Sequence, residues 1–121
     1  MRNMTMKNGL YLAQFAVPST RGQGWEAAHG AAYIRDSKVY GGDSGHWWQG
    51  DVITSVDNTF SIDLAIKVHT TGGSSSVFGY FSEFELKVSG KLNGDAWQAD
   101  GETNVAPGRP MQLNLRLLQA D

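Results

Sequence analysis

The sequence contains no cysteine. This absence excludes disulfide bonds, zinc sites built from thiolates, and cysteine nucleophiles. It is also compatible with a reducing compartment, and we expect a cytoplasmic protein. Proline is scarce, with 3 residues, whereas glycine is abundant, with 15. We expect the glycines where strands bend and where the chain turns.

The chain also lacks an excess of charge of one sign and a long apolar segment. Ten basic and twelve acidic residues give a net charge of −2 and are scattered singly, without the basic patch typical of nucleic-acid-binding proteins. No window approaches the roughly 20 apolar residues that a membrane helix needs. We therefore expect neither direct nucleic-acid binding nor membrane insertion. The apolar stretch 10–17 alternates like a strand and is followed by no small-residue cleavage site, so we expect no cleaved signal.

The dominant pattern in the sequence is a strict alternation of apolar and polar residues. It is clearest in Phe60–Val68, where every second side chain is apolar and Asp63 and Lys67 occupy the other face. A helix would scatter these side chains around its circumference, so the pattern predicts a strand. Weaker versions occur at Tyr11–Val17, Tyr80–Val88 and Met111–Leu117. The residues that we expect to line a lumen are Phe15, Phe60, Ile62, Leu64, Ile66, Tyr80, Phe84, Leu86, Leu113 and Leu115.

The same succession of short sequence motifs occurs twice along the chain. The segment Lys38–Asp43 (KVYGGD) is similar to Lys91–Asp95 (KLNGD), and each is followed by tryptophan and then by an alternating strand. Two copies of a several-strand unit predict a closed barrel. The expected fold class is therefore all-β: a single up-and-down, lipocalin- or calycin-like β-barrel of about eight strands, built from two sequence-related halves.

We expect one domain over residues 1–121. Within it, residues 1–6 form a disordered tail, 9–69 the first half, 70–78 a linker loop and 79–118 the second half. Further strands are expected at 30–36, 38–42, 46–54 and 92–100, with turns at 56–59 and 89–90. The glycines and aspartates of the repeat are expected to form structural turns: Gly41, Gly42, Asp43, Gly94 and Asp95.

Residues that could carry chemistry form no catalytic or metal-binding pattern. The three histidines, at 29, 46 and 69, have neither HxH nor HxxxH spacing. No serine lies in a nucleophile-elbow pattern. We expect no enzymatic activity, no metal site and no cofactor.

The most conspicuous local cluster is His46-Trp47-Trp48. Adjacent residues of a strand face opposite sides, so one tryptophan is expected in the core and the other on the outer surface. An outward tryptophan would be an exposed apolar anchor, which favours a protein interface. The other interpretation is an aromatic platform for a ligand at the mouth of the barrel.

Four short motifs occur in order along the chain: MKNGLY at 6–11, GGD at 41–43, QGDV at 49–52 and IKVH at 66–69. In this order they resemble the GrlR family, small bacterial β-barrel proteins named for a negative regulator of type III secretion. The resemblance covers roughly residues 6–69, and the second half matches only in pattern. It implies a lipocalin-like barrel, a homodimer, and regulation by sequestering a transcriptional activator protein rather than by touching DNA.

The resemblance also points to a contact region. In the founding member, an acidic run after the strand matching Asp51–Thr54 contacts the activator. The matching stretch here is 55–59, in which Asp57 is the acidic residue and is followed by Asn58. Because only Asp57 is acidic, the founding member's contact is not present here in that form. The candidate partner contacts are Asp57 and Asn58 from the resemblance, and Trp47 and Trp48 from the strand geometry.

Two functional hypotheses follow. The first is a non-enzymatic regulatory protein, a homodimer that binds a transcriptional regulator protein. The alternative is a barrel that binds or senses a small lipophilic ligand, such as a lipid, in its lumen, because the inward rows are aliphatic and aromatic.

Overall fold

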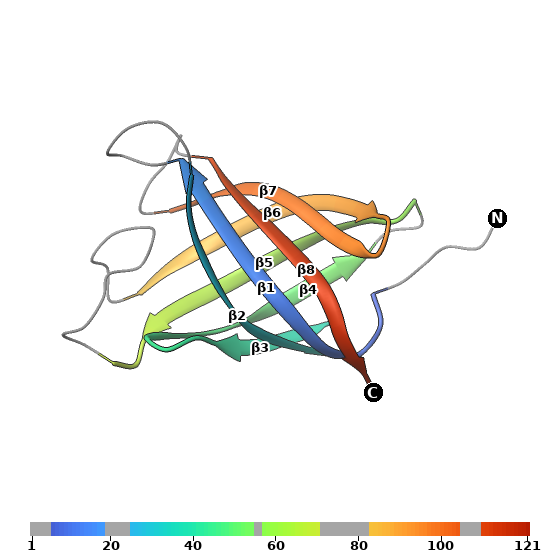
Figure 1. Ribbon diagram of the computed structural model, residues 1–121, viewed down its shortest axis with the longest axis horizontal. Coiled ribbons are helices and arrows are strands. Elements are labelled where there is room, and N and C mark those ends of the chain that lie inside the picture. The colour runs from blue at the N-terminus through green and yellow to red at the C-terminus, as the bar shows by residue number, and fades with distance from the viewer. Residues whose placement is uncertain (1–5, 19–24, 55–56, 71–82, 105–109) are drawn as a thin grey trace.

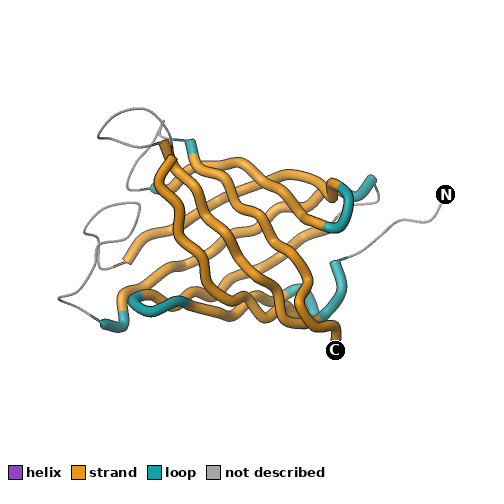
Figure 2. Tube along the Cα trace, in the orientation of Figure 1, coloured by secondary structure: helices purple, strands orange, loops and turns teal. Residues whose placement is uncertain are grey.

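The computed structural model describes residues 6–18, 25–54, 57–70, 83–104 and 110–121. Within these residues all regular structure is strand, and no helix is long and apolar enough to cross a membrane (Figure 2). The eight strands are β1 (Gly9–Pro18), β2 (Trp25–Arg35), β3 (Lys38–Gly42), β4 (His46–Thr54), β5 (Thr59–Val68), β6 (Glu83–Asn93), β7 (Ala96–Thr103) and β8 (Met111–Ala120).

The strands form one closed barrel in which each strand is antiparallel to the next and β8 returns to pair with β1 (Figure 1). The predicted all-β, up-and-down barrel of eight strands is thereby confirmed. Each of the eight strands pairs with a neighbour on both sides, although residues 25–30 of β2 extend beyond β3 and pair with β1 alone. The barrel is strongly coiled, and Figure 1 shows β1 and β8 crossing in front of β4 and β5.

Alternating side chains from the strands fill the interior. Each of the expected lumen residues that the structure describes is buried, with at most 4% of its surface exposed, and all belong to one apolar cluster. Tyr80 lies outside the described residues. An eight-stranded barrel has an interior just wide enough for side chains to fill, which is the arrangement seen here. The buried predicted residues are Phe15, Phe60, Ile62, Leu64, Ile66, Phe84, Leu86, Leu113 and Leu115.

Two tryptophans pack inside the barrel against phenylalanine edges. Trp48 of β4 meets Phe15 of β1, and Trp97 of β7 meets Phe60 of β5, each with ring centroids 5.3 Å apart and nearly perpendicular planes. Edge-to-face pairs of this kind add to the stabilisation that burial provides.

Two glycines of the wall lie against both a neighbouring strand and the indole of Trp48. A side-chain carbon at Gly30 would lie 2.5 Å from the carbonyl oxygen of Gly42 and 2.8 Å from the ring. One at Gly41 would overlap the carbonyl oxygen of Ala31 and lie 2.6 Å from the indole Nε1. Gly41 and Gly42, expected in a turn, therefore lie in β3, and Asp43 begins the turn. The Nε1 of Trp48 is buried without a hydrogen-bond partner among the described residues.

Three other expectations differ from the structure. Ser89 and Gly90, expected in a turn, lie in the middle of β6, where the carbonyl oxygen of Gln98 occupies the space of a side chain at Gly90. The segment 92–100, expected as one strand, is divided by the turn at Gly94 and Asp95. Met6, expected in the tail, is buried with the core, and residues 1–5 lie outside the described residues.

One end of the barrel is closed by contacts between distant segments. Asp36 and Ser37 both have positive φ and form the two-residue turn between β2 and β3. Asn8 exchanges hydrogen bonds with Asp36, at 3.0 and 3.3 Å, and its carbonyl oxygen accepts one from the N–H of Asp121. The Tyr33 hydroxyl donates to the Asp121 carboxylate at 2.6 Å, which raises the pKa of Tyr33.

Candidate functional site

The outer surface of the barrel is organised in rows. Residues that are opposite one another on neighbouring strands form rows that run across the strands, and every second residue of a strand faces outward. Because the sheet is twisted and coiled, its outer surface is hollowed between some of these rows. Three such grooves are lined mainly by outward side chains.

One groove crosses β3, β4, β5 and β6 and has a volume of about 500 Å³. Its first rim is the row Lys38, Asp51, Asp63 and Lys87, and its second is Tyr40, Gln49, Ala65 and Glu85. The rims therefore carry three carboxylates and two ammonium groups around one exposed aromatic ring. We call this the β3–β6 groove.

Two charges of the first rim, those of Lys38 and Asp51, are paired. Lys38 Nζ forms an ion pair with Asp51, and both side chains are more than half exposed. The hydrogen bond to the Asp51 carboxylate raises the pKa of Lys38. An ion pair this exposed contributes little to stability, so its main effect is to make this part of the surface polar.

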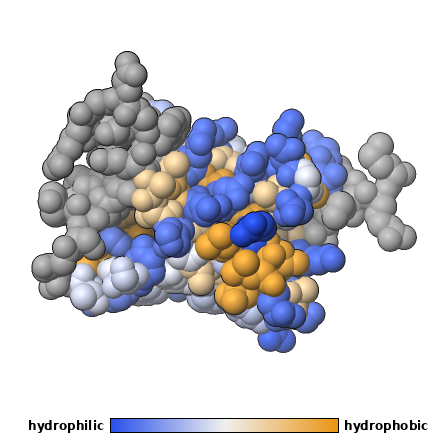
Figure 3. All heavy atoms as spheres, viewed as in Figure 1, coloured by the Kyte–Doolittle hydropathy of each residue, from blue (hydrophilic) through white to orange (hydrophobic). Residues whose placement is uncertain are grey.

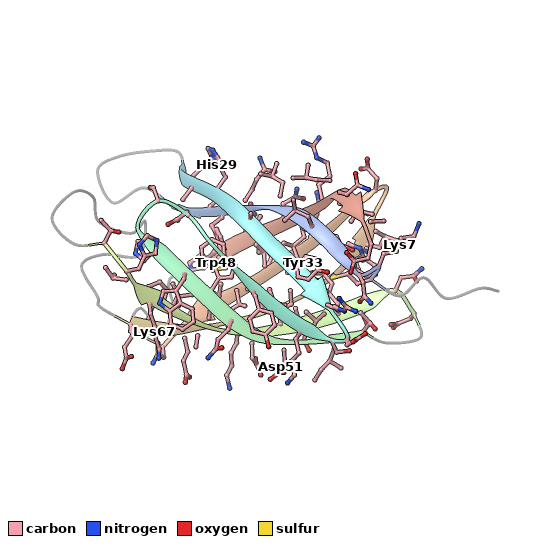
Figure 4. All side chains as sticks on the ribbon, turned by 90° about the horizontal axis from the view of Figure 1, so that it is seen from below. Lys7, His29, Tyr33, Trp48, Asp51 and Lys67 are labelled. Carbon is pink, nitrogen blue, oxygen red and sulfur yellow. The ribbon has the colours of Figure 1, made fainter. Side chains whose placement is uncertain are left out.

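Aromatic side chains extend the second rim. Tyr40 of β3 is 52% exposed and lies opposite Tyr33 of β2, while Trp47 of β4, 38% exposed, lies diagonally beyond Tyr40. The ammonium group of Lys67 lies 5.4 Å from the centroid of the Trp47 ring, in a cation–π contact. Figure 4 shows Lys67 and Asp51 on the outside of the barrel. We call Tyr33, Tyr40 and Trp47 the aromatic patch.

The two predicted interaction tryptophans face opposite sides of β4. Trp47 faces solvent, whereas Trp48 is 2% exposed and lies between the strands (Figure 4). Only Trp47 is accessible to a partner in this conformation. Tyr33 and Tyr40 are not among the predicted contact residues, although Tyr40 follows the buried Val39 and alternation alone places it outward.

The predicted contact residues Asp57 and Asn58 lie at the other end of β4 from Trp47, in the turn before β5. The Asp57 carboxylate accepts hydrogen bonds from the Thr59 hydroxyl at 2.6 Å and from the Thr59 N–H at 3.3 Å, and these lower the pKa of Asp57. Asn58 has φ of 64°, and its carbonyl oxygen accepts from the N–H of Leu92. These two residues build the turn, and the structure does not bring them to the aromatic patch.

Two of the three histidines, His46 and His69, lie beside the turn at Asp43, and His29 lies in β2. Asp43 accepts hydrogen bonds from the N–H groups of Gly45 and His46. The Nδ1 of His46 lies 3.4 Å from the same carboxylate, and His69 contacts the Asp43 carbonyl oxygen through Nε2 at 3.0 Å. In the part of the chain that the structure describes, no three histidine, aspartate or glutamate residues are grouped to hold a metal ion.

A second exposed apolar area lies over the first and last strands, β1 and β8. Figure 3 shows apolar atoms gathered where β1 begins and β8 ends. Leu10 of β1 and Leu118 of β8 are 39% and 52% exposed there. We call these two residues the leucine patch.

No model of a known protein family matches the chain. Comparison with curated proteins likewise finds no match. What the protein binds must therefore be argued from its surfaces.

Proposed function

We propose that this barrel is a cytoplasmic, non-enzymatic regulatory protein that acts by binding a transcriptional activator protein, as its resemblance to GrlR-type negative regulators implies. The observation that carries the proposal is the aromatic patch beside the β3–β6 groove. Tyrosine and tryptophan are enriched at the centres of protein interfaces, where they contribute most of the binding energy.

The rest of the surface supports a protein partner over a buried ligand. The interior is filled by the barrel's own side chains, so the lipophilic-ligand alternative gains no support from the described residues. The carboxylates and lysines of the groove rims would supply orientation and selectivity around the aromatic anchors.

The proposal is tested by capture with matched variants. The wild-type protein should retain a transcriptional activator from lysate of the source organism, and Tyr40→Ala/Trp47→Ala should bind it at least about tenfold more weakly. Ile53→Ala is the control, because Ile53 is an exposed apolar residue of the same strand, β4, away from the patch. Equal capture by all three proteins, or capture of no activator, contradicts the proposal.

We also propose that the protein forms a homodimer through the leucine patch. Exposed leucines on two adjacent paired strands give an apolar surface that association would remove from water. Light scattering should then give twice the 13.2 kDa mass of the chain, and Leu118→Asp should halve it. Tyr40→Ala/Trp47→Ala should remain dimeric, and a monomeric wild-type protein contradicts this part of the proposal.

A further inference from the structure

A second, larger groove crosses β1, β8, β7, β6 and β5 and has a volume of about 1010 Å³ (Figure 1 shows the order of these strands). It shares no lining residue with the β3–β6 groove, but a third groove of about 620 Å³ lies between them and shares lining residues with both. Its volume is at the upper end of the roughly 300–1,000 Å³ typical of ligand sites. We call it the amide groove.

Two adjacent rows of outward side chains form its rims. The first rim consists of Gln14, Asn114, Gln98 and Lys91, each opposite the next on neighbouring strands. The second rim consists of Gln112, Asp100, Ser89 and Ser61, in the same order of strands. The row between the two rims has its side chains inside the barrel, and its backbone forms the floor of the groove. This row runs from Phe15 through Leu113, Ala99 and Gly90 to Phe60.

The chemistry of the rims is almost neutral and rich in hydrogen-bonding groups. Four primary amides and two hydroxyls accompany one carboxylate and one ammonium group. An amide presents both donors and an acceptor, which matches a hydroxyl group, itself donor and acceptor. A polyanion would need several cations, which these rims lack. The two ends of the second rim are apolar, with Ala16 and Ala27 beyond Gln112 and the exposed Ile53 beyond Ser61.

Contacts within the first rim hold the amides in place. The Nδ2 of Asn114 donates to the Oε1 of Gln14 at 3.2 Å, and the Nδ2 of Asn93 donates to the Oε1 of Gln98 at 3.0 Å. With these oxygens engaged, the Nε2 groups of Gln14 and Gln98 remain as donors for a ligand. Side chains that are ordered before binding lose less entropy when a ligand binds.

The shape of the groove favours an elongated ligand. Five strands at about 4.8 Å spacing give an arc of about 19 Å that follows the curved wall half-way round the eight-stranded barrel and is longer than a single sugar ring. An extended peptide commonly binds by adding a strand to a free sheet edge. Residues 25–30 of β2 pair with β1 alone, and none of the eight rim residues lies there.

We propose that the amide groove binds an uncharged oligosaccharide that follows part of the arc across β1, β8, β7, β6 and β5. Its hydroxyl groups accept from the amides of Gln14 and Gln98 and donate to Asp100 and to the amide oxygens of Asn114 and Gln112. The proposed site differs from the protein-binding face, and either proposal can fail without the other.

The test is a titration followed by side-chain amide NMR signals. The probes are cellohexaose, maltohexaose and chitohexaose, with a sulfated heparin oligosaccharide as the charged comparison. At least one neutral probe should shift the signals of Gln14, Gln98 and Asn114 in a saturable way and leave Gln49, on the β3–β6 groove, unmoved.

Variants sharpen the test. Gln98→Ala and Asn114→Ala should each weaken binding about twofold to tenfold, as expected for one lost hydrogen bond. Gln49→Ala, a matched exposed amide on β4, should bind like the wild type. The proposal is overturned if no neutral probe binds, if only the sulfated probe binds, or if the Gln49 signals shift equally.

Discussion

Gly41 shows how one missing side chain fixes a tryptophan in the core. A carbon at this position would overlap the carbonyl oxygen of Ala31 and press on the Trp48 indole. We predict that Gly41→Ala destabilises the protein by about 1–3 kcal/mol or more, because neither the wall nor the buried ring can move freely. Urea unfolding followed by tryptophan fluorescence measures the change.

Gly45→Ala is the matched control for that substitution. Nothing lies within 4 Å of a side-chain carbon at Gly45, and its φ is not in the left-handed region. Its unfolding free energy should stay within about 1 kcal/mol of the wild type, or rise slightly through reduced entropy of the unfolded chain. If both variants lost the same free energy of unfolding, the close packing of Trp48 would not be the reason why glycine is needed at position 41.

At the scale of the strands, alternation was the informative part of the sequence. The period of two in Phe60–Val68 depends only on neighbours in the chain, so it correctly predicts the strand and its inward face. Gly90 could not be placed in the same way. The carbonyl oxygen of Gln98, which excludes a side chain at Gly90, belongs to another strand. The residues next to Gly90 in the sequence do not show this contact, and they predict a turn instead.

The candidate sites were only partly predictable for the same reason. That one of Trp47 and Trp48 faces outward follows from strand geometry, but which one depends on Gly30 and Gly41 on β2 and β3. The amide groove joins Gln14 to Asn114, which are 100 residues apart in the chain. Such rows exist only once the register of the closed sheet is known.

The turn between β4 and β5 makes a pH-dependent contribution. Hydrogen bonds from Thr59, first from its hydroxyl and then from its N–H, lower the pKa of Asp57 below its ordinary value of 3.8. The folded state therefore favours the ionised carboxylate. This contribution is fully present above about pH 4 and is lost as the pH falls through the lower folded-state pKa.

We accordingly predict a pH-dependent difference between the wild type and Asp57→Asn. The stability advantage of the wild type over the variant should shrink as the pH is lowered below about 4, since the asparagine cannot titrate. Urea unfolding of both proteins across a pH series measures it. A difference that stays constant through this range would mean that the Thr59 hydrogen bonds do not favour the charged form.

The whole barrel is a closed wall around a filled interior. One aromatic pair, Phe15 and Trp48, joins β1 to β4, and the other, Phe60 and Trp97, joins β5 to β7. Leu86 of β6 has no exposed surface. A lipid in the lumen would have to displace such side chains, and dense interiors resist this because each displaced group gives up its contacts.

This packing predicts that freshly purified protein carries no lumen ligand. Native mass spectrometry should give the mass of the chain, or a whole multiple of it, without an apolar adduct. Leu86→Ala is the matched variant, because it should cost about 2–5 kcal/mol and open a cavity that a small apolar molecule such as benzene can enter. Benzene should therefore raise the melting temperature of the variant but not of the wild type. A stoichiometric adduct on the wild-type protein would instead support a lipophilic ligand and assign the function to the lumen.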